Sequence, residues 1–109
     1  MRAVVVFGVT VACLAANPSL AQTRAEAGHY LAQQWCSSCH QVEPEGRATD
    51  TAPPFVSLAN ERPADLAWVR TRLQLPRYPM AGINLSRDQI EDIIAYFAAL
   101  RREPERQIP

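Results

Sequence analysis

The stretch WCSSCHQVEP, residues 35–44, places two cysteines three positions apart with a histidine directly behind the second. On a helix, Cys36, Cys39 and His40 stand at positions i, i+3 and i+4, so their side chains project from one face. The chain has three cysteines, and the third, Cys13, lies far away in the N-terminal segment. We therefore expect the two thiols and the imidazole to act together.

The N-terminal segment has the layout of a secretory signal peptide. One positive charge, Arg2, precedes an uncharged run over residues 3–16, and Asn17, Pro18 and small residues follow. This pattern predicts a signal peptide over residues 1–21, cleaved after Ala21. The protein is then exported, and the expected location is the periplasm.

Two alternatives to a cleaved signal peptide remain at this point. A membrane anchor would need roughly 20 apolar residues, whereas the uncharged run has 14, so we expect no stable membrane span after cleavage. Cleavage in front of Cys13 would make the protein a lipoprotein, but residues 10–12 fit that signal poorly.

Residues 22–109 form one small domain with limited capacity to bury apolar surface. Their eleven acidic residues face ten arginines once Arg2 is removed, and the chain contains no lysine. Basic residues that are scattered and offset by acids give no nucleic-acid-binding surface. Nucleic acid is therefore not an expected partner.

The apolar periodicity predicts an all-α domain without strands. A first helix is expected from Thr23 to about Ser37, with Leu31 and Trp35 on its buried face, and a short helical turn at residues 55–58. A further helix is expected from Pro63 to about Leu73, with Leu66, Val69 and Leu73 on one stripe. The last helix is expected to run from a capping box at residues 86–89 to about Arg101 or Arg102. Its expected buried positions are Ile90, Ile93, Ile94, Phe97 and Leu100. The tail 102–109 is expected to be frayed.

The order C-x-x-C-H is the attachment sequence of c-type haem, in which both thiols bond the porphyrin and the imidazole binds iron. Three alternative roles remain for these residues: a zinc site, a thioredoxin-like redox pair and a disulfide. Zinc usually takes four protein ligands, and only these three are grouped. A thioredoxin-like pair belongs beside a β-sheet, which is not expected here, and a disulfide between Cys36 and Cys39 closes too small a loop to stabilise much.

A haem iron needs a sixth ligand or an open position. Met80, the one methionine besides Met1, lies 40 residues beyond His40 in a proline-bounded loop, and a thioether beside histidine raises the reduction potential. The alternative is that Met80 only fills a gap in the core. His29 lies seven residues before Cys36, on nearly the same helix face, and is expected to be a packing histidine.

Four segments together resemble a bacterial class I cytochrome c: GHYLAQQWCSSCH, APPF, YPM and LSRDQIEDIIAYFAAL. The resemblance spans nearly all of residues 22–109. It implies a small cytochrome c fold, with three to five helices wrapped around one covalently attached haem. The lysines that often ring the haem edge in mitochondrial relatives are absent from this chain.

The resemblance also implies roles for individual residues. Gly28 matches the glycine at which the first helix crosses the last, with Tyr96 or Phe97 as its neighbour. Pro53 or Pro54 matches the proline whose carbonyl accepts a hydrogen bond from the axial histidine. Trp68 and Arg70 are the candidates for the haem environment near a propionate.

The function implied is that of a periplasmic mono-haem electron carrier, not an enzyme, with redox proteins as partners. Two alternatives stay open. In the first, Met80 does not bind and the protein is a haem enzyme or gas sensor with an open iron position. In the second, the domain is a dedicated subunit of a dehydrogenase or oxidase complex.

Overall fold

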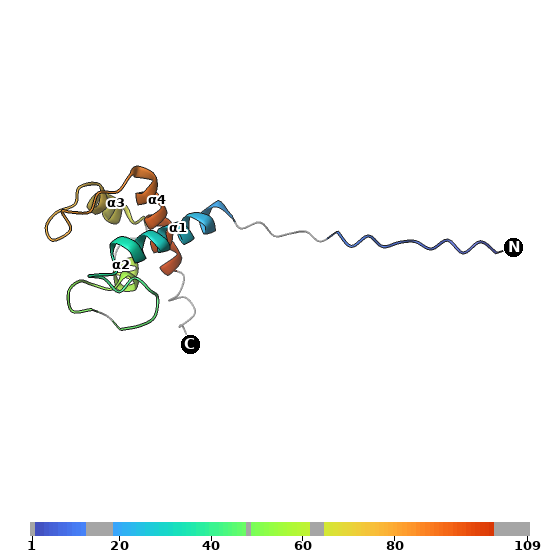
Figure 1. Cartoon of the computed structure of the whole chain (residues 1–109), viewed down its shortest axis with the longest axis horizontal. Coiled ribbons are helices and arrows are strands. Elements are labelled where there is room, and N and C mark those ends of the chain that lie inside the picture. Colours follow the sequence, from blue (N-terminus) through green and yellow to red (C-terminus); the bar gives the residue numbers. More distant parts are fainter. Residues whose placement is uncertain (1, 13–18, 48, 62–64, 102–109) are drawn as a thin grey trace.

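The computed structural model describes residues 2–12, 19–47, 49–61 and 65–101, and the regular secondary structure in these ranges is entirely helical. The helices are α1 (Leu20–Trp35), α2 (Phe55–Asn60), α3 (Ala67–Gln74) and α4 (Arg87–Leu100), as shown in Figure 1. The predicted all-α class is confirmed. The predicted frayed tail, the predicted helix start at Pro63 and residues 13–18 of the predicted signal peptide lie outside the described residues.

Residues 2–12 have no regular secondary structure and are exposed, and they extend away from the helical domain (Figure 1). Within the described ranges, no helix combines the length and the apolar character that crossing a membrane requires.

Helix α1 begins earlier than predicted because Ser19 caps it. The Ser19 hydroxyl accepts a hydrogen bond from the Gln22 amide at 3.2 Å, and the Gln22 side chain accepts one from the Ser19 amide at 3.3 Å. This reciprocal pair satisfies two amides that a helix start otherwise leaves unpaired. The helix therefore runs through the predicted cleavage position at Ala21, and cleavage there would remove its cap.

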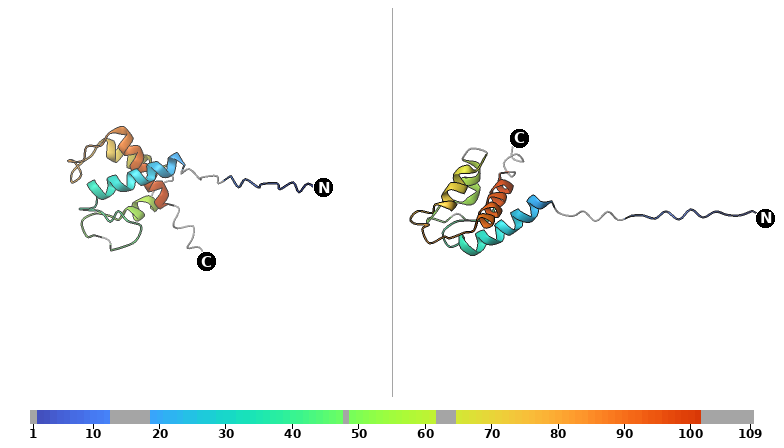
Figure 2. Two further views of the ribbon diagram at one scale, coloured as in Figure 1. Left: turned by 45° about the vertical axis from the view of Figure 1, so that its right-hand side comes forward. Right: turned by 90° about the horizontal axis from the view of Figure 1, so that it is seen from above.

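Helix α1 crosses α4 at Gly28, and the crossing is very close. A Cβ atom at Gly28 would overlap the carbonyl oxygen of Asp92 and lie 2.9 Å from the amide nitrogen of Ile93. The predicted crossing is therefore present, and the atoms nearest to a Cβ at Gly28 belong to the backbone of Asp92 and Ile93. Figure 2 shows the two helices passing across one another.

The predicted buried face of α1 is wrong for Trp35, whereas Leu31 packs against the edge of the core. Trp35 is 53% exposed and Leu31 only half-buried, whereas the buried positions are Gly28 and Ala32. The close approach of the α1 and α4 backbones explains this difference, because only small side chains fit between two helices at such a distance. The larger residues of α1 are displaced to the edge of the contact.

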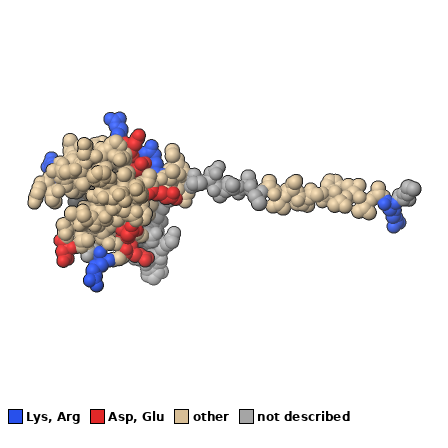
Figure 3. Space-filling view, viewed as in Figure 1, with Lys and Arg blue, Asp and Glu red and all other residues tan. Residues whose placement is uncertain are grey.

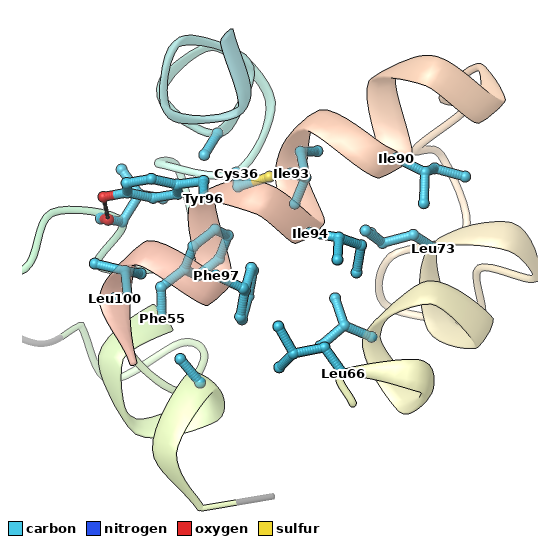
Figure 4. Close-up of a cluster of buried hydrophobic side chains, with 14 residues drawn as sticks. Cys36, Phe55, Leu66, Leu73, Ile90, Ile93, Ile94, Tyr96, Phe97 and Leu100 are labelled. Atoms are coloured by element: carbon cyan, nitrogen blue, oxygen red, sulfur yellow. Dashed lines mark hydrogen bonds between the residues drawn. The ribbon is translucent and has the colours of Figure 1, made fainter. Parts of the chain in front are cut away.

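Helix α4 is the centre of the domain and contacts α1, α2 and α3. Ser86 and Gln89 form the predicted capping box, with bonds of 3.1 and 2.9 Å. The five predicted core positions of α4 are all buried, together with Tyr96. Figure 4 shows these side chains packed against residues of the other helices.

Helix α3 covers Ala67–Gln74, and Leu66, which the predicted helix includes, precedes it in a left-handed backbone conformation with φ 54°. That conformation is costly for a residue with a Cβ atom. Leu66 is nevertheless only 3% exposed, so it is placed in the core from a position just before the helix. The predicted stripe of Leu66, Val69 and Leu73 is buried as expected.

Candidate cofactor site

The two thiols and the imidazole occupy a turn that directly follows α1. Cys36 is the C-cap residue of α1, so the helix stops before the predicted end at Ser37. The His40 amide still donates to the Cys36 carbonyl at 2.9 Å, and the Cys39 amide donates to the same oxygen at 3.2 Å. The i, i+4 relation between Cys36 and His40 therefore persists beyond the helix.

The two cysteines have different surroundings. Cys36 is buried, and burial raises the pKa of its thiol to about 11. Cys39 is exposed, and both thiols are free, so the structure does not contain the alternative disulfide. Cys36 faces the core beside Ile93 and Phe97, as Figure 4 and the cavity lining show.

The ring of His40 is held by a backbone carbonyl. Its Nδ1 lies 2.7 Å from the carbonyl oxygen of Pro53, and the ring makes an edge contact with Phe55 at a centroid distance of 5.3 Å. A carbonyl can only accept, so the hydrogen is assigned to Nδ1, which leaves the lone pair on Nε2 for a metal. Of the two prolines implied by the resemblance, Pro53 makes this contact, and Pro54 is the N-cap residue of α2.

The loop between His40 and α2 is closed by hydrogen bonds at its base. The Phe55 amide donates to the Gln41 carbonyl at 2.9 Å, and the Thr49 hydroxyl donates to the Cys39 carbonyl at 2.5 Å. These bonds bring the two ends of the loop together and place Pro53 beside His40.

An apolar cavity of about 60 Å³ lies next to this turn. Its lining comes from all four helices or the segments next to them: Cys36, His40, Phe55, Leu58, Trp68, Val69, Arg72, Leu73, Met80, Ile93 and Phe97. A second hollow continues from it, shares His40, Leu58, Trp68, Arg72 and Met80, and is also lined by Pro53 and Arg77. The volume of the second hollow, about 840 Å³, falls in the range of about 300–1,000 Å³ that is usual for ligand and cofactor sites.

The fold therefore brings Met80 and Trp68 to the same cavity as Cys36 and His40. Met80 is half-buried in a turn that two hydrogen bonds define: its amide donates to the Arg77 carbonyl at 2.7 Å, and its carbonyl accepts from the Ile83 amide at 3.0 Å. Met80 also packs against the core, so its side chain has a packing role whether or not it binds a metal.

Arg70, which the resemblance places near a propionate, lines neither hollow. Arg70 donates two hydrogen bonds to Glu91, at 2.7 and 3.1 Å, which raises the pKa of Arg70 and lowers that of Glu91. Residues two apart on a helix point in nearly opposite directions, and Arg72 is the one that lines the cavity. The sequence did not indicate that Arg72 and Arg77 line the site. The pairing of Arg70 with Glu91 could not be predicted either, because the two residues are 21 positions apart and no short-range pattern links them.

The charge and donor set of the cavity limit what it can bind. Arg72 and Arg77 are its charged lining residues in the described part of the chain, and no acidic side chain joins them. Within the same ranges, no group of three or more His, Cys, Asp or Glu side chains is arranged to hold a metal ion.

The residues at the cavity fit a c-type haem. Two free thiols and the His40 imidazole, with its Nε2 available, lie in one turn. The thioether of Met80 and apolar side chains line the adjoining cavity, and the guanidinium groups of Arg72 and Arg77 suit the carboxylates of a porphyrin.

Comparisons of the chain with protein-family models, with curated proteins and with solved structures found no match.

Proposed function

We propose that this protein is an exported electron carrier of the periplasm with one covalently attached c-type haem. Cys36 and Cys39 would form the thioether links, and His40 and Met80 would be the two iron ligands. The observation that carries the proposal is that Cys36, His40 and Met80 line one apolar cavity although Met80 is remote from the other two in the sequence. When bound, the haem supplies an iron centre that takes up and releases one electron.

The hydrogen bond from His40 to Pro53 has a direct chemical effect on such a site. A carbonyl acceptor on Nδ1 fixes the tautomer and the orientation of the ring and makes Nε2 a more basic ligand. Pro53 thereby favours the ferric state, whereas the thioether of Met80 and the apolar walls favour the ferrous state. The reduction potential follows from the balance of these two influences.

Arg72 and Arg77 suit the anionic end of the cofactor. Within the described residues neither side chain forms an ion pair, and both line the hollow that continues from the inner cavity. A guanidinium group binds a carboxylate through two parallel hydrogen bonds. We assign these two arginines, in place of Arg70, to the carboxylates of the porphyrin.

The distribution of surface residues suits contact with a redox protein. Leu75 and Tyr78, on the loop that carries Met80, are 66% and 89% exposed, and the face drawn in Figure 3 has a broad uncharged area with arginines and acidic residues around it. Exposed aromatic side chains such as Tyr78 are enriched in protein interfaces. A free shuttle and a subunit of a larger redox complex would both use such a surface.

Mass spectrometry and absorption spectroscopy of the exported protein test the proposal. The expected mass is that of residues 22–109 plus one haem, the pigment should resist extraction with acidified acetone, and the spectrum should be low-spin with a sulfur-to-iron band. A colourless protein, or one that loses its pigment to the solvent, would refute covalent attachment. A high-spin spectrum would instead support the haem enzyme or gas sensor, in which Met80 is not bound.

A further inference from the structure

A polar cluster on the outer side of α1 joins three parts of the fold. His29 Nε2 lies 2.8 Å from both carboxylate oxygens of Glu43, and the Gln33 amide donates to one of these oxygens at 2.7 Å. The His29 ring stacks on Tyr96 of α4, with a centroid distance of 4.6 Å and an interplanar angle of 6°. The cluster therefore links α1, α4 and the segment that follows His40.

Tyr96 makes a second connection to the same segment. Its hydroxyl donates to the carbonyl oxygen of Val42 at 2.5 Å (Figure 4), and both Tyr96 and Val42 are buried. A buried carbonyl without a partner is costly, so this bond gives the Val42 backbone a strong preference for its position. Burial raises the pKa of Tyr96 to about 12, and the nearby Glu43 charge adds to the rise, so the hydroxyl keeps its proton as a donor.

The segment that these contacts hold begins immediately after His40. Val42 and Glu43 are two and three residues beyond it, and the intervening Gln41 carries the carbonyl that accepts from Phe55. The hydrogen bonds of Glu43 to Gln33 and His29 lower the pKa of Glu43, so its carboxylate stays charged and engaged. Residues 41–43 are thus fixed on the outside by α1 and α4 and on the inside by the start of α2.

We infer that His29 and Tyr96 are positioning residues that clamp segment 41–43 and so keep the His40 imidazole on the carbonyl of Pro53. Neither side chain lines the cavity, so they act through the backbone of the loop. The inference rests on the proposed function only in treating His40 as an iron ligand, because the clamp on the loop exists without a cofactor.

Amide hydrogen exchange in the purified full-length protein tests the clamp. In Tyr96→Phe, exchange of the Phe55 amide, which reports on the base of the loop, should become roughly tenfold faster, as expected from the loss of one buried hydrogen bond. In His29→Ala the increase should be smaller, because the contact of His29 with Glu43 is partly exposed. His29→Gln retains an N–H donor for Glu43 and should restore most of the protection. The Leu75 amide, which donates to Thr71 at the end of α3, serves as an internal reference.

Glu91→Gln is the matched control, because it breaks a bidentate pair between α3 and α4 that does not touch the loop. It should leave the exchange of Phe55 unchanged. If the Phe55 and Leu75 amides accelerate equally in Tyr96→Phe, the side chain supports only global stability, and the clamp is refuted. Unchanged exchange in both Tyr96→Phe and His29→Ala refutes it as well.

Nitrogen NMR of the His40 ring tests the connection to Pro53 and requires no electron-transfer activity. The Nδ1 proton should exchange several-fold faster in Tyr96→Phe than in the wild-type protein, and slowly again in Glu91→Gln. A slow Nδ1 proton in a variant with a loosened loop would show that the clamp does not reach His40. Failure of the proposed function would appear separately, as a protein without pigment, and these exchange measurements would remain valid.

Discussion

Gly28 on α1 lies against the backbone of Asp92 on α4 so closely that a methyl group at position 28 would overlap the Asp92 carbonyl. We predict that Gly28→Ala lowers the free energy of unfolding by about 3 kcal/mol or more, since a backbone cannot yield as a side chain does. Gly82→Ala is the control, because a Cβ atom there meets nothing within 4 Å. Urea denaturation of both variants measures the difference, and similar stabilities would contradict the close crossing.

Replacement of Met80 by alanine tests its assignment as the sixth ligand. The sulfur-to-iron band should disappear, and the reduction potential should fall by on the order of 0.1 V, a part of the ~0.8 V over which axial ligands set haem potentials. Redox titration followed by absorption measures both effects. Tyr78→Phe, a change at an exposed position of the same loop, should alter neither, and a band that persists in Met80→Ala would remove Met80 from the ligand set.

The double variant Cys36→Ala, Cys39→Ala should yield a haem-free chain that is largely unfolded. The cavity walls are apolar and come from every helix, so without a cofactor they lose contact area that this small core cannot replace. Far-UV circular dichroism with thermal melting is the measurement. A haem-free monomer that melts cooperatively would show that the domain does not depend on a cofactor.

Arg72→Gln and Arg70→Gln should behave differently although the two residues are close in sequence. Loss of the Arg72 charge beside the cavity should lower the reduction potential by tens of millivolts, on the order expected for one charge at an effective dielectric constant of about 20. Arg70→Gln should have a smaller effect, because Arg72 lines both hollows and Arg70 lines neither. Equal shifts in the two variants would show that Arg72 has no special relation to the cofactor.

The raised pKa of Tyr96 predicts a loss of stability in alkali. The pKa rises from its ordinary value of 10 to about 12 in the folded state. The folded state therefore binds this proton more tightly than the unfolded state, and the resulting stabilisation is complete below pH 10 and lost as the pH rises to 12. Urea denaturation over this range should show a decline in the wild-type protein that Tyr96→Phe lacks; parallel declines would contradict the assignment.

The elements that were predicted well are those with a strong local signal. The capping box at Ser86 and Gln89 and the apolar positions of α4 are present as predicted, because caps and helical periodicity depend on residues within a few positions. The helical conformation of Leu66 and the burial of Trp35 were predicted wrongly. Both depend on tertiary packing: Leu66 enters the core in a left-handed conformation, and α4 comes too close to α1 for large side chains.

The sequence by itself determined the spacing of Cys36, Cys39 and His40, the helical class and the identity of Met80 as a candidate ligand, since these are matters of order and short-range pattern. Only the tertiary structure decided that Met80 reaches the cavity beside His40, that Arg72 replaces Arg70 there, and that His29, Glu43 and Tyr96 meet. The physical reason is that these contacts join residues far apart in the chain, and their geometry depends on how closely the helix backbones approach.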